Sequence, residues 1–271
     1  MNANQTEPTV RSAEAAPATE AAQPAAGGTA PAVRRRDADS WAKPVDRLAV
    51  ADGAGGVAAT VAGRRVAGPL QGFGQMWQKS YRVRLPAEAG VSPEQVVEVW
   101  KAEFPTFWPK GNTFYAPLAG IRPGEVALLS VSAAGPVKLH SGVVVMYADE
   151  EAFTLMTPEG HMLAAWITFG AARQPDGSVV VQAQALERAS DPFFELGLVL
   201  FGNRANNRFW EATLRNVAAR FGATEPVVET QVTCVDRRRQ WRYARNVRYN
   251  AGIRAALHAA GAPIRSVLRR S

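Results

Sequence analysis

The sequence predicts an α+β fold in which a curved antiparallel sheet wraps around a long C-terminal helix. Two observations support this prediction. A series of strand-like segments in the middle of the chain is joined by short turns, which is typical of an antiparallel meander, and a long amphipathic segment follows the last of them. Hydrophobic residues make up 47% of the 271 residues, which is enough for a substantial core.

The first strand and the first helix follow from local patterns. Residues Met76–Leu85 alternate between apolar and polar side chains, as a half-buried strand does, and Pro86 ends the run. Ser92 is then followed by a proline at the first helical position and by Gln95 at the third, a pattern that predicts a capping box. The helix that starts here should end before Pro105.

Five more strands are expected after a proline-rich link. The segments between them contain turn formers such as Gly, Pro and Asp. The predicted strands cover residues 126–131, 137–147, 153–157, 162–169 and 179–186.

The hydrophobic period then changes from that of a strand to that of a helix. Asp191 is expected to cap a long helix with Phe194, Leu198 and Phe201 on its apolar face, and Gly222 is a natural C-terminal stop. Because a strongly bent sheet cannot follow a straight helix along its whole length, we expect a space between them that could hold a ligand.

The domain with this fold should cover residues 68–222. Residues 1–40 are mostly Ala, Pro, Thr, Glu and Gly, so they are expected to form a disordered leader, and residues 41–67 are expected to be a linker.

The last segment, residues 223–271, is a basic extension. It holds ten arginines, no lysine and three acids, and this excess of seven equals the net charge of +7 of the whole chain. An edge strand is expected over residues 227–235, followed by a basic helix from Asp236 to about residue 260.

The order of these elements is similar to that of the START, polyketide-cyclase and pollen-allergen (SRPBCC) superfamily, whose helix-grip fold encloses a hydrophobic pocket. Four segments, 139–147, 153–166, 191–197 and 207–210, resemble a bacterial branch of that superfamily with a domain of unknown function. The resemblance covers about residues 68–222. It implies a pocket but no particular reaction, since this fold hosts carriers and enzymes alike.

A pocket of this kind suits a hydrophobic small molecule such as a lipid, a polyketide or an aromatic metabolite. The alternative is that the same aromatic residues fill a solid core. Gln182 and Gln184 would hydrogen-bond a ligand if they face inward, and strand alternation leaves their face open. The candidate pocket residues are Trp77, Tyr81, Trp100, Trp108, Phe114, Met146, Met156, Trp166, Gln182, Gln184, Phe194, Leu198 and Phe201.

An enzyme of cyclase, hydrolase or dehydratase type would use the same pocket. Its proton carriers would be His161 and Glu159, which share a predicted hairpin turn, or His140 in a predicted strand. The alternative for all three is an ordinary solvent-exposed position. No histidine has zinc-ligand spacing and no glycine-rich phosphate loop is present, so the sequence predicts no metal and no cofactor.

The basic helix offers candidate anion-binding residues, because Arg238, Arg242 and Arg245 fall together on a helical wheel. The helix could dock on the domain, or it could bind an anionic membrane surface or a nucleic acid, in which case the chain would be an interaction protein. The sequence shows no signal-peptide pattern and no membrane-spanning segment, and Cys234 is its single cysteine, so we expect a cytoplasmic protein.

Overall fold

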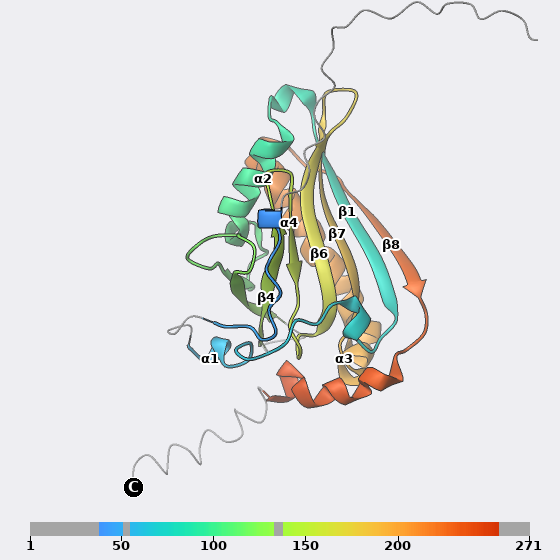
Figure 1. Ribbon diagram of the computed structural model, residues 1–271. Coiled ribbons are helices and arrows are strands. Elements are labelled where there is room, and N and C mark those ends of the chain that lie inside the picture. The colour runs from blue at the N-terminus through green and yellow to red at the C-terminus, as the bar shows by residue number, and fades with distance from the viewer. Residues whose placement is uncertain (1–37, 51–54, 133–137, 255–271) are drawn as a thin grey trace, which may run out of the picture. The chain divides into compact units, whose positions relative to one another are not determined.

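The computed structural model describes residues 38–50, 55–132 and 138–254. Within these ranges, eight strands form one curved antiparallel sheet in the order β2-β3-β4-β5-β6-β7-β1-β8 (Figure 1). The strands are β1 (Met76–Leu85), β2 (Thr113–Tyr115), β3 (Val126–Ser132), β4 (Lys138–Ala148), β5 (Ala152–Met156), β6 (Leu163–Arg173), β7 (Val179–Ala189) and β8 (Val228–Asp236).

The two longest α-helices are α2 and α4. The α-helices are α1 (Gly55–Ala58), α2 (Pro93–Ala102), α3 (Pro192–Gly197) and α4 (Asn203–Arg220), and η5 (Leu198–Gly202) is a π-helical turn. The 3₁₀ segments are η1 (Ala38–Ser40), η2 (Pro69–Gln71), η3 (Ala87–Ala89), η4 (Phe104–Phe107) and η6 (Trp241–Tyr249). No helix in the described ranges combines the length and the apolar character needed to cross a lipid bilayer.

The α+β class and the antiparallel sheet are confirmed, and several element limits follow the local signals. Strand β1 has the predicted bounds. The capping box of α2 is formed, because Ser92 Oγ accepts from the Gln95 N–H and the Gln95 side chain accepts from the Ser92 N–H. These limits depend on contacts within one turn of chain, which is why the sequence could predict them.

The segment predicted as one helix after Asp191 occurs as α3, η5 and α4 in succession. Asp191 Oδ1 accepts from the N–H groups of Phe193 and Phe194 at 2.9 and 3.0 Å, so it caps α3 as expected. Gly222, with φ of 82°, ends α4 in the left-handed region that favours glycine. The π-helical turn between the two helices was not foreseen.

Helices α2 and α4 lie on the same side of the sheet and bury an aromatic core against it (Figure 1). Trp100 and Phe104 are fully buried, and their rings contact those of Phe153 and Phe169 with centroids 5.2 to 6.0 Å apart. Leu214 of α4 completes this core. Helix α4 contacts β1, β7 and β8.

In the described parts of the segment expected to be a linker, residues 41–50 and 55–67, apolar side chains pack on the sheet. Leu48 and Val61 are buried in a second apolar cluster with Leu128 and Val144, on the opposite face of the sheet from α2 and α4. Gly142 permits this packing, because a Cβ there would lie 2.7 Å from the Ala127 carbonyl oxygen and 3.0 Å from Val61. Of the leader expected over residues 1–40, residues 1–37 lie outside the described part of the chain.

The C-terminal extension also packs on the domain. Strand β8 pairs with β1 at the edge of the sheet. In place of the single helix expected from Asp236 to residue 260, the structure has a 3₁₀ segment, η6, and then α-helical residues 251–254. The last predicted residues, 255–260, lie outside the described part. The Gln240 N–H donates to the Phe73 carbonyl at 2.7 Å, and the buried Asn250 side chain donates to Asp191 Oδ2 at 2.9 Å, so this segment is tied to the domain at both ends.

Candidate functional site

Most of the aromatic pocket candidates on the helix side pack against one another. Trp100 and Trp108 join the cluster around Phe104, where the Trp108 ring lies 5.3 Å from the Phe114 ring between centroids. Tyr81 is fully buried beside them in the same core. Trp77 on β1 and Phe194 and Leu198 of the α3–η5 segment are half-buried, and nothing is described of the Phe201 side chain.

Five other pocket candidates lie on the face of the sheet opposite to α2 and α4. Met146 and Met156 pack with the second cluster, and Trp166 is 41% exposed. Gln182 and Gln184 alternate with the buried Val181 and Ala183, so they point away from α2 and α4. Strand alternation predicted that Gln182 and Gln184 share a face, but only the packing of remote elements shows which face of the sheet the helices cover.

The helix side also holds a buried polar cluster that the sequence reasoning missed. Lys79 Nζ and Glu187 Oε1 are 2.7 Å apart, with side chains 1% and 4% exposed. From α4, Asn203 Oδ1 accepts from Lys79 at 3.2 Å and Asn206 donates to Glu187 at 2.9 Å. The signals were present: Lys79 occupies an inward position of β1, and the asparagines of α4 recur at helical spacing. Because each charge is paired and hydrogen-bonded, this cluster joins α4 to the sheet.

Tyr81 belongs to the same region. Its hydroxyl donates to Asn207 Oδ1 at 2.8 Å. Burial, reinforced by the negative charges of Glu187 and Glu211, raises the pKa of this phenol far above its usual value, so it stays protonated and acts as a donor.

The three candidate proton carriers are not brought together as a catalytic group. His161 is buried in the β5–β6 turn, where its Nδ1 accepts from the Leu163 N–H at 3.0 Å, and burial lowers its pKa to about 4. Glu159, two residues earlier, is half-buried and lines a pocket from which His161 is absent. His140 is half-buried on β4, in register with Ser130 of β3, on the face away from the helices.

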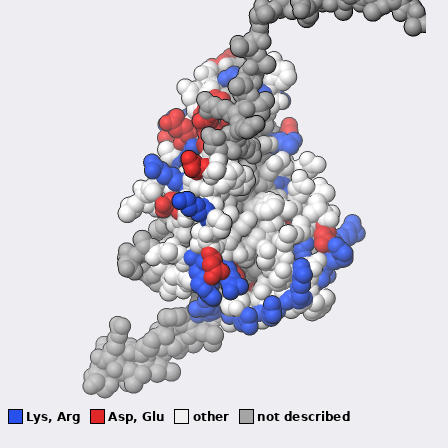
Figure 2. Space-filling view, in the orientation of Figure 1, with Lys and Arg blue, Asp and Glu red and all other residues white. Residues whose placement is uncertain are grey.

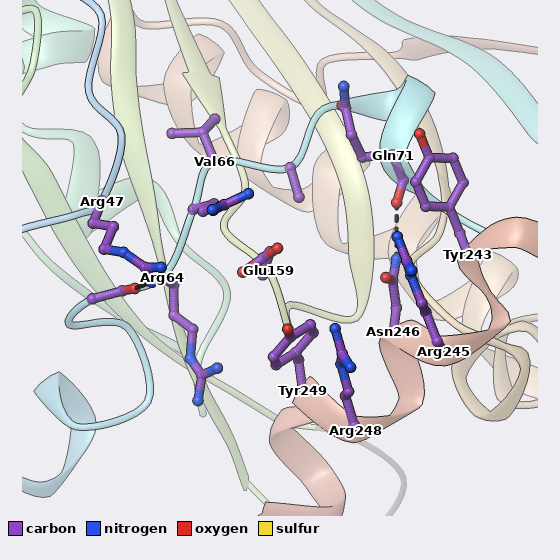
Figure 3. A pocket seen from close by; sticks show the side chains of 13 residues that line it. Arg47, Arg64, Val66, Gln71, Glu159, Tyr243, Arg245, Asn246, Arg248 and Tyr249 are labelled. Atoms are coloured by element: carbon purple, nitrogen blue, oxygen red, sulfur yellow. Dashed lines mark hydrogen bonds between the residues drawn. The ribbon is translucent and has the colours of Figure 1, made fainter.

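The pocket that Glu159 lines is enclosed by segments from both ends of the described chain. One wall is made by residues 47, 63–67 and 71, and the other by η6, with a volume of about 560 Å³ between them. Figure 3 shows Arg47 and Arg64 on one side and Arg245 and Arg248 reaching in from η6 on the other. Lys and Arg residues also gather along the lower edge in Figure 2, where Figure 1 has η6.

The 3₁₀ geometry of η6 explains which of its residues face this pocket. With three residues per turn, positions three apart share a face, and Tyr243, Asn246 and Tyr249 are half-buried against the domain. Asn246 Nδ2 donates to the carbonyls of Gln71 and Ser190 at 2.9 and 3.0 Å. Gly160, with φ of 89°, lets Tyr249 approach the β5–β6 turn, because a Cβ at Gly160 would collide with the Tyr249 carbonyl.

The pocket has a strong positive charge. Five arginines and one acid line it, which leaves a formal excess of four positive charges. Within the described ranges, none of these five guanidinium groups forms an ion pair. Two of them are held by the Tyr249 ring, whose centroid lies 5.4 Å from the Arg64 guanidinium carbon and 4.7 Å from that of Arg248. The five are Arg47, Arg64, Arg65, Arg245 and Arg248.

Only one of the predicted anion-binding arginines, Arg245, lines this pocket. Arg238 pairs with Asp236 at 3.0 Å, and the Arg242 guanidinium lies over the Tyr243 ring at 4.8 Å. Their predicted common face assumed one α-helix that includes all three arginines, but η6 begins only at Trp241, so Arg238 lies outside it. Arg47 and Arg64 were missed because they lie in the segment expected to be a linker.

Solved structures with a similar fold were found at low sequence identity. The protein Ara h 8.0201 is 10% identical over 54% of this chain and 99% of its own, with a TM-score of 0.38. A START superfamily protein from Mycobacterium smegmatis is 16% identical over 55% of this chain and 98% of its own, with a TM-score of 0.35. Protein Ms6760, also from Mycobacterium smegmatis, is 10% identical over 54% of this chain and 92% of its own, with a TM-score of 0.37. No family model and no curated protein matches the chain.

Proposed function

We propose that the protein binds a small acidic molecule, one with a phosphate or carboxylate group, in the arginine-lined pocket. The observation that supports this most directly is the convergence of five arginines on a pocket with a single carboxylate, where no described acidic residue forms an ion pair with them. The volume of about 560 Å³ lies within the usual range for small-molecule sites.

The chemistry of the lining narrows the ligand class. Guanidinium groups stay protonated and bind phosphate or carboxylate through two parallel hydrogen bonds. Glu159 can accept a hydrogen bond from a hydroxyl or amino group of the same ligand, and Tyr243 and Tyr249 offer ring surfaces. The pocket therefore suits an organic acid or phosphate ester that also carries a donor group.

A hydrophobic small molecule on the helix side of the sheet is the second candidate. It rests on a helix-grip arrangement in which the sheet wraps around α4, and the contacts of α4 with β1, β7 and β8 support this arrangement. Ile167 and Trp210 pack on the helix-side core but are only half-buried, which favours accessible space beside α4. A lipid, polyketide or aromatic metabolite would then contact Phe194 and Leu198. Neither proposal includes a chemical step.

Isothermal titration calorimetry with phenyl phosphate, benzoate and neutral phenol at constant, low ionic strength tests the first proposal. We expect saturable binding of the two acids at one site and none of phenol. The double substitution R64Q/R248Q should weaken binding of phenyl phosphate at least tenfold, because each arginine makes a charge-assisted hydrogen bond.

The matched control is R204Q/R208Q, which removes the same charge from exposed positions on α4. It should leave the affinity unchanged. Absence of saturable binding by either acid, or an equal loss in both double variants, would contradict the proposal. The second candidate has a separate test: native mass spectrometry of protein purified from its own host should reveal a bound apolar compound.

A further inference from the structure

A row of large apolar side chains is exposed on the α3–η5 segment, outside the pocket described above. Phe193 and Leu196 are each 60% exposed, and Val199 and Leu200 are each 58% exposed. A helix on the surface of a domain usually turns polar residues to solvent. Four adjacent apolar residues on one segment therefore mark an interaction surface.

The orientation of α3 is fixed by polar contacts on its other side. Glu195 is buried, and its Oε1 accepts from Arg239 Nε at 3.1 Å and from the Gln75 N–H at 3.4 Å. Gly74 leaves room for this carboxylate, because a Cβ there would collide with it. The capping residue Asp191 is fully buried as well. These contacts prevent α3 from turning its apolar row inward.

The exposed face continues into α4 with positive charge. Arg204 and Arg208 follow Leu196 and Leu200 at intervals of four residues, and both are exposed. The π-helical turn lengthens one turn of the segment, so residues four apart remain on one face. In the described part of the chain neither arginine forms an ion pair. Glu195 is the only acid between residues 192 and 210, and it is buried.

We propose that α3, η5 and the first turns of α4 dock on an anionic lipid bilayer. The four apolar side chains enter the headgroup region, and Arg204 and Arg208 contact lipid phosphates, as in interfacial amphipathic helices. A second copy of the chain fits less well, because this face offers no exposed acid between residues 192 and 210 to pair with the arginines of the other copy. The inference is independent of the proposed pocket ligand.

Vesicle flotation tests the proposal, with phosphatidylcholine vesicles compared with vesicles of phosphatidylcholine and phosphatidylglycerol in equal parts. We expect binding to the anionic vesicles that weakens with added salt. The substitution R204Q/R208Q should reduce the partition coefficient about 25-fold, which corresponds to about 1 kcal/mol for each arginine. Phe193→Ser/Leu200→Ser should reduce it at least as much, with the thermal melting of each variant checked to exclude unfolding.

The matched control is R64Q/R248Q, which removes two charges from the pocket and should leave vesicle binding within about twofold of the wild type. The variant Phe193→Trp supplies a direct readout: its added indole fluorescence should be quenched by lipids with spin-labelled acyl chains. An equal loss of vesicle binding in R204Q/R208Q and R64Q/R248Q would show non-specific charge attraction and overturn the proposal. So would absence of binding to anionic vesicles, or sedimentation data in which Phe193→Ser/Leu200→Ser dissociates a dimer.

Discussion

His161 is a neutral imidazole held in the β5–β6 turn by the backbone of Leu163. Its Nδ1 lies 3.0 Å from the Leu163 nitrogen and 3.1 Å from the Leu163 carbonyl oxygen. Burial lowers its pKa to about 4, below the usual value of 6.5. The unfolded chain therefore binds a proton more readily than the folded chain between these two pH values. His161 makes its full contribution to stability above pH 6.5, and this is lost as the pH falls toward 4.

We predict that this one residue makes stability depend on pH. Urea unfolding of the wild type should lose on the order of 3 kcal/mol from His161 between pH 7 and pH 4, the free energy that corresponds to its lowered pKa. In His161→Asn the amide oxygen can still accept from Leu163, but it does not titrate, so the loss over the same pH range should be smaller by about that amount. The same pH dependence in both proteins would show that His161 is not the cause.

At the scale of elements, α4 is attached to the sheet by a polar cluster as well as by its apolar face. Lys79 and Glu187 come from neighbouring strands, and Asn203 and Asn206 come from α4. The apolar contacts of Leu214 alone would let α4 slide or rotate on the sheet with little change in buried area. A hydrogen-bonded ion pair forms only when α4 occupies one position relative to the strands. We infer that the cluster sets the position of α4 along β1 and β7.

Replacing only Lys79 of the buried ion pair should lower the free energy of unfolding more than replacing both Lys79 and Glu187. Lys79→Met leaves the Glu187 carboxylate buried without its cation, and we expect a loss of about 3 to 5 kcal/mol in the free energy of unfolding. The double variant Lys79→Met/Glu187→Met should be more stable than Lys79→Met alone. Guanidinium chloride unfolding of the four proteins in this cycle measures the difference, and additive losses would contradict a direct coupling.

At the scale of the whole molecule, the arginine-lined pocket joins parts of the chain that are far apart in sequence. Arg64 lies before the first strand of the sheet, Glu159 between β5 and β6, and Arg248 after the last strand. An anion bound among them would hold the two flanking segments on the domain. Ligand binding and global stability should therefore be linked.

We predict that phenyl phosphate raises the melting temperature of the wild type in a saturable, concentration-dependent way. At a ligand concentration of about one hundred times Kd, the expected stabilisation is about 2.7 kcal/mol. Differential scanning calorimetry at constant ionic strength measures it, with chloride as the matched salt. The R64Q/R248Q protein should show little shift, and an equal shift with chloride would indicate a general salt effect.

Local rules allowed much of the fold to be predicted. The alternation of β1, the Ser92 capping box, the Asp191 cap and the Gly222 stop depend on residues within a turn or a strand of one another. Less of the candidate site could be predicted from the sequence. Arg245 was singled out, but Arg47 and Arg64 carry no local signal that relates them to Arg245, and the 3₁₀ form of η6 was not expected.

The sequence by itself determined the strand and helix signals, the change of period after Asp191 and the concentration of net charge in the last segment. Only the tertiary structure decided that Trp166 and Gln184 face away from the helices, that Leu48 and Val61 pack on the sheet, and that arginines from both ends of the domain share a pocket. The physical reason is that backbone period and capping are set by neighbours along the chain. The covered face of a strand and the meeting of distant charges depend on the packing of elements that are remote in sequence.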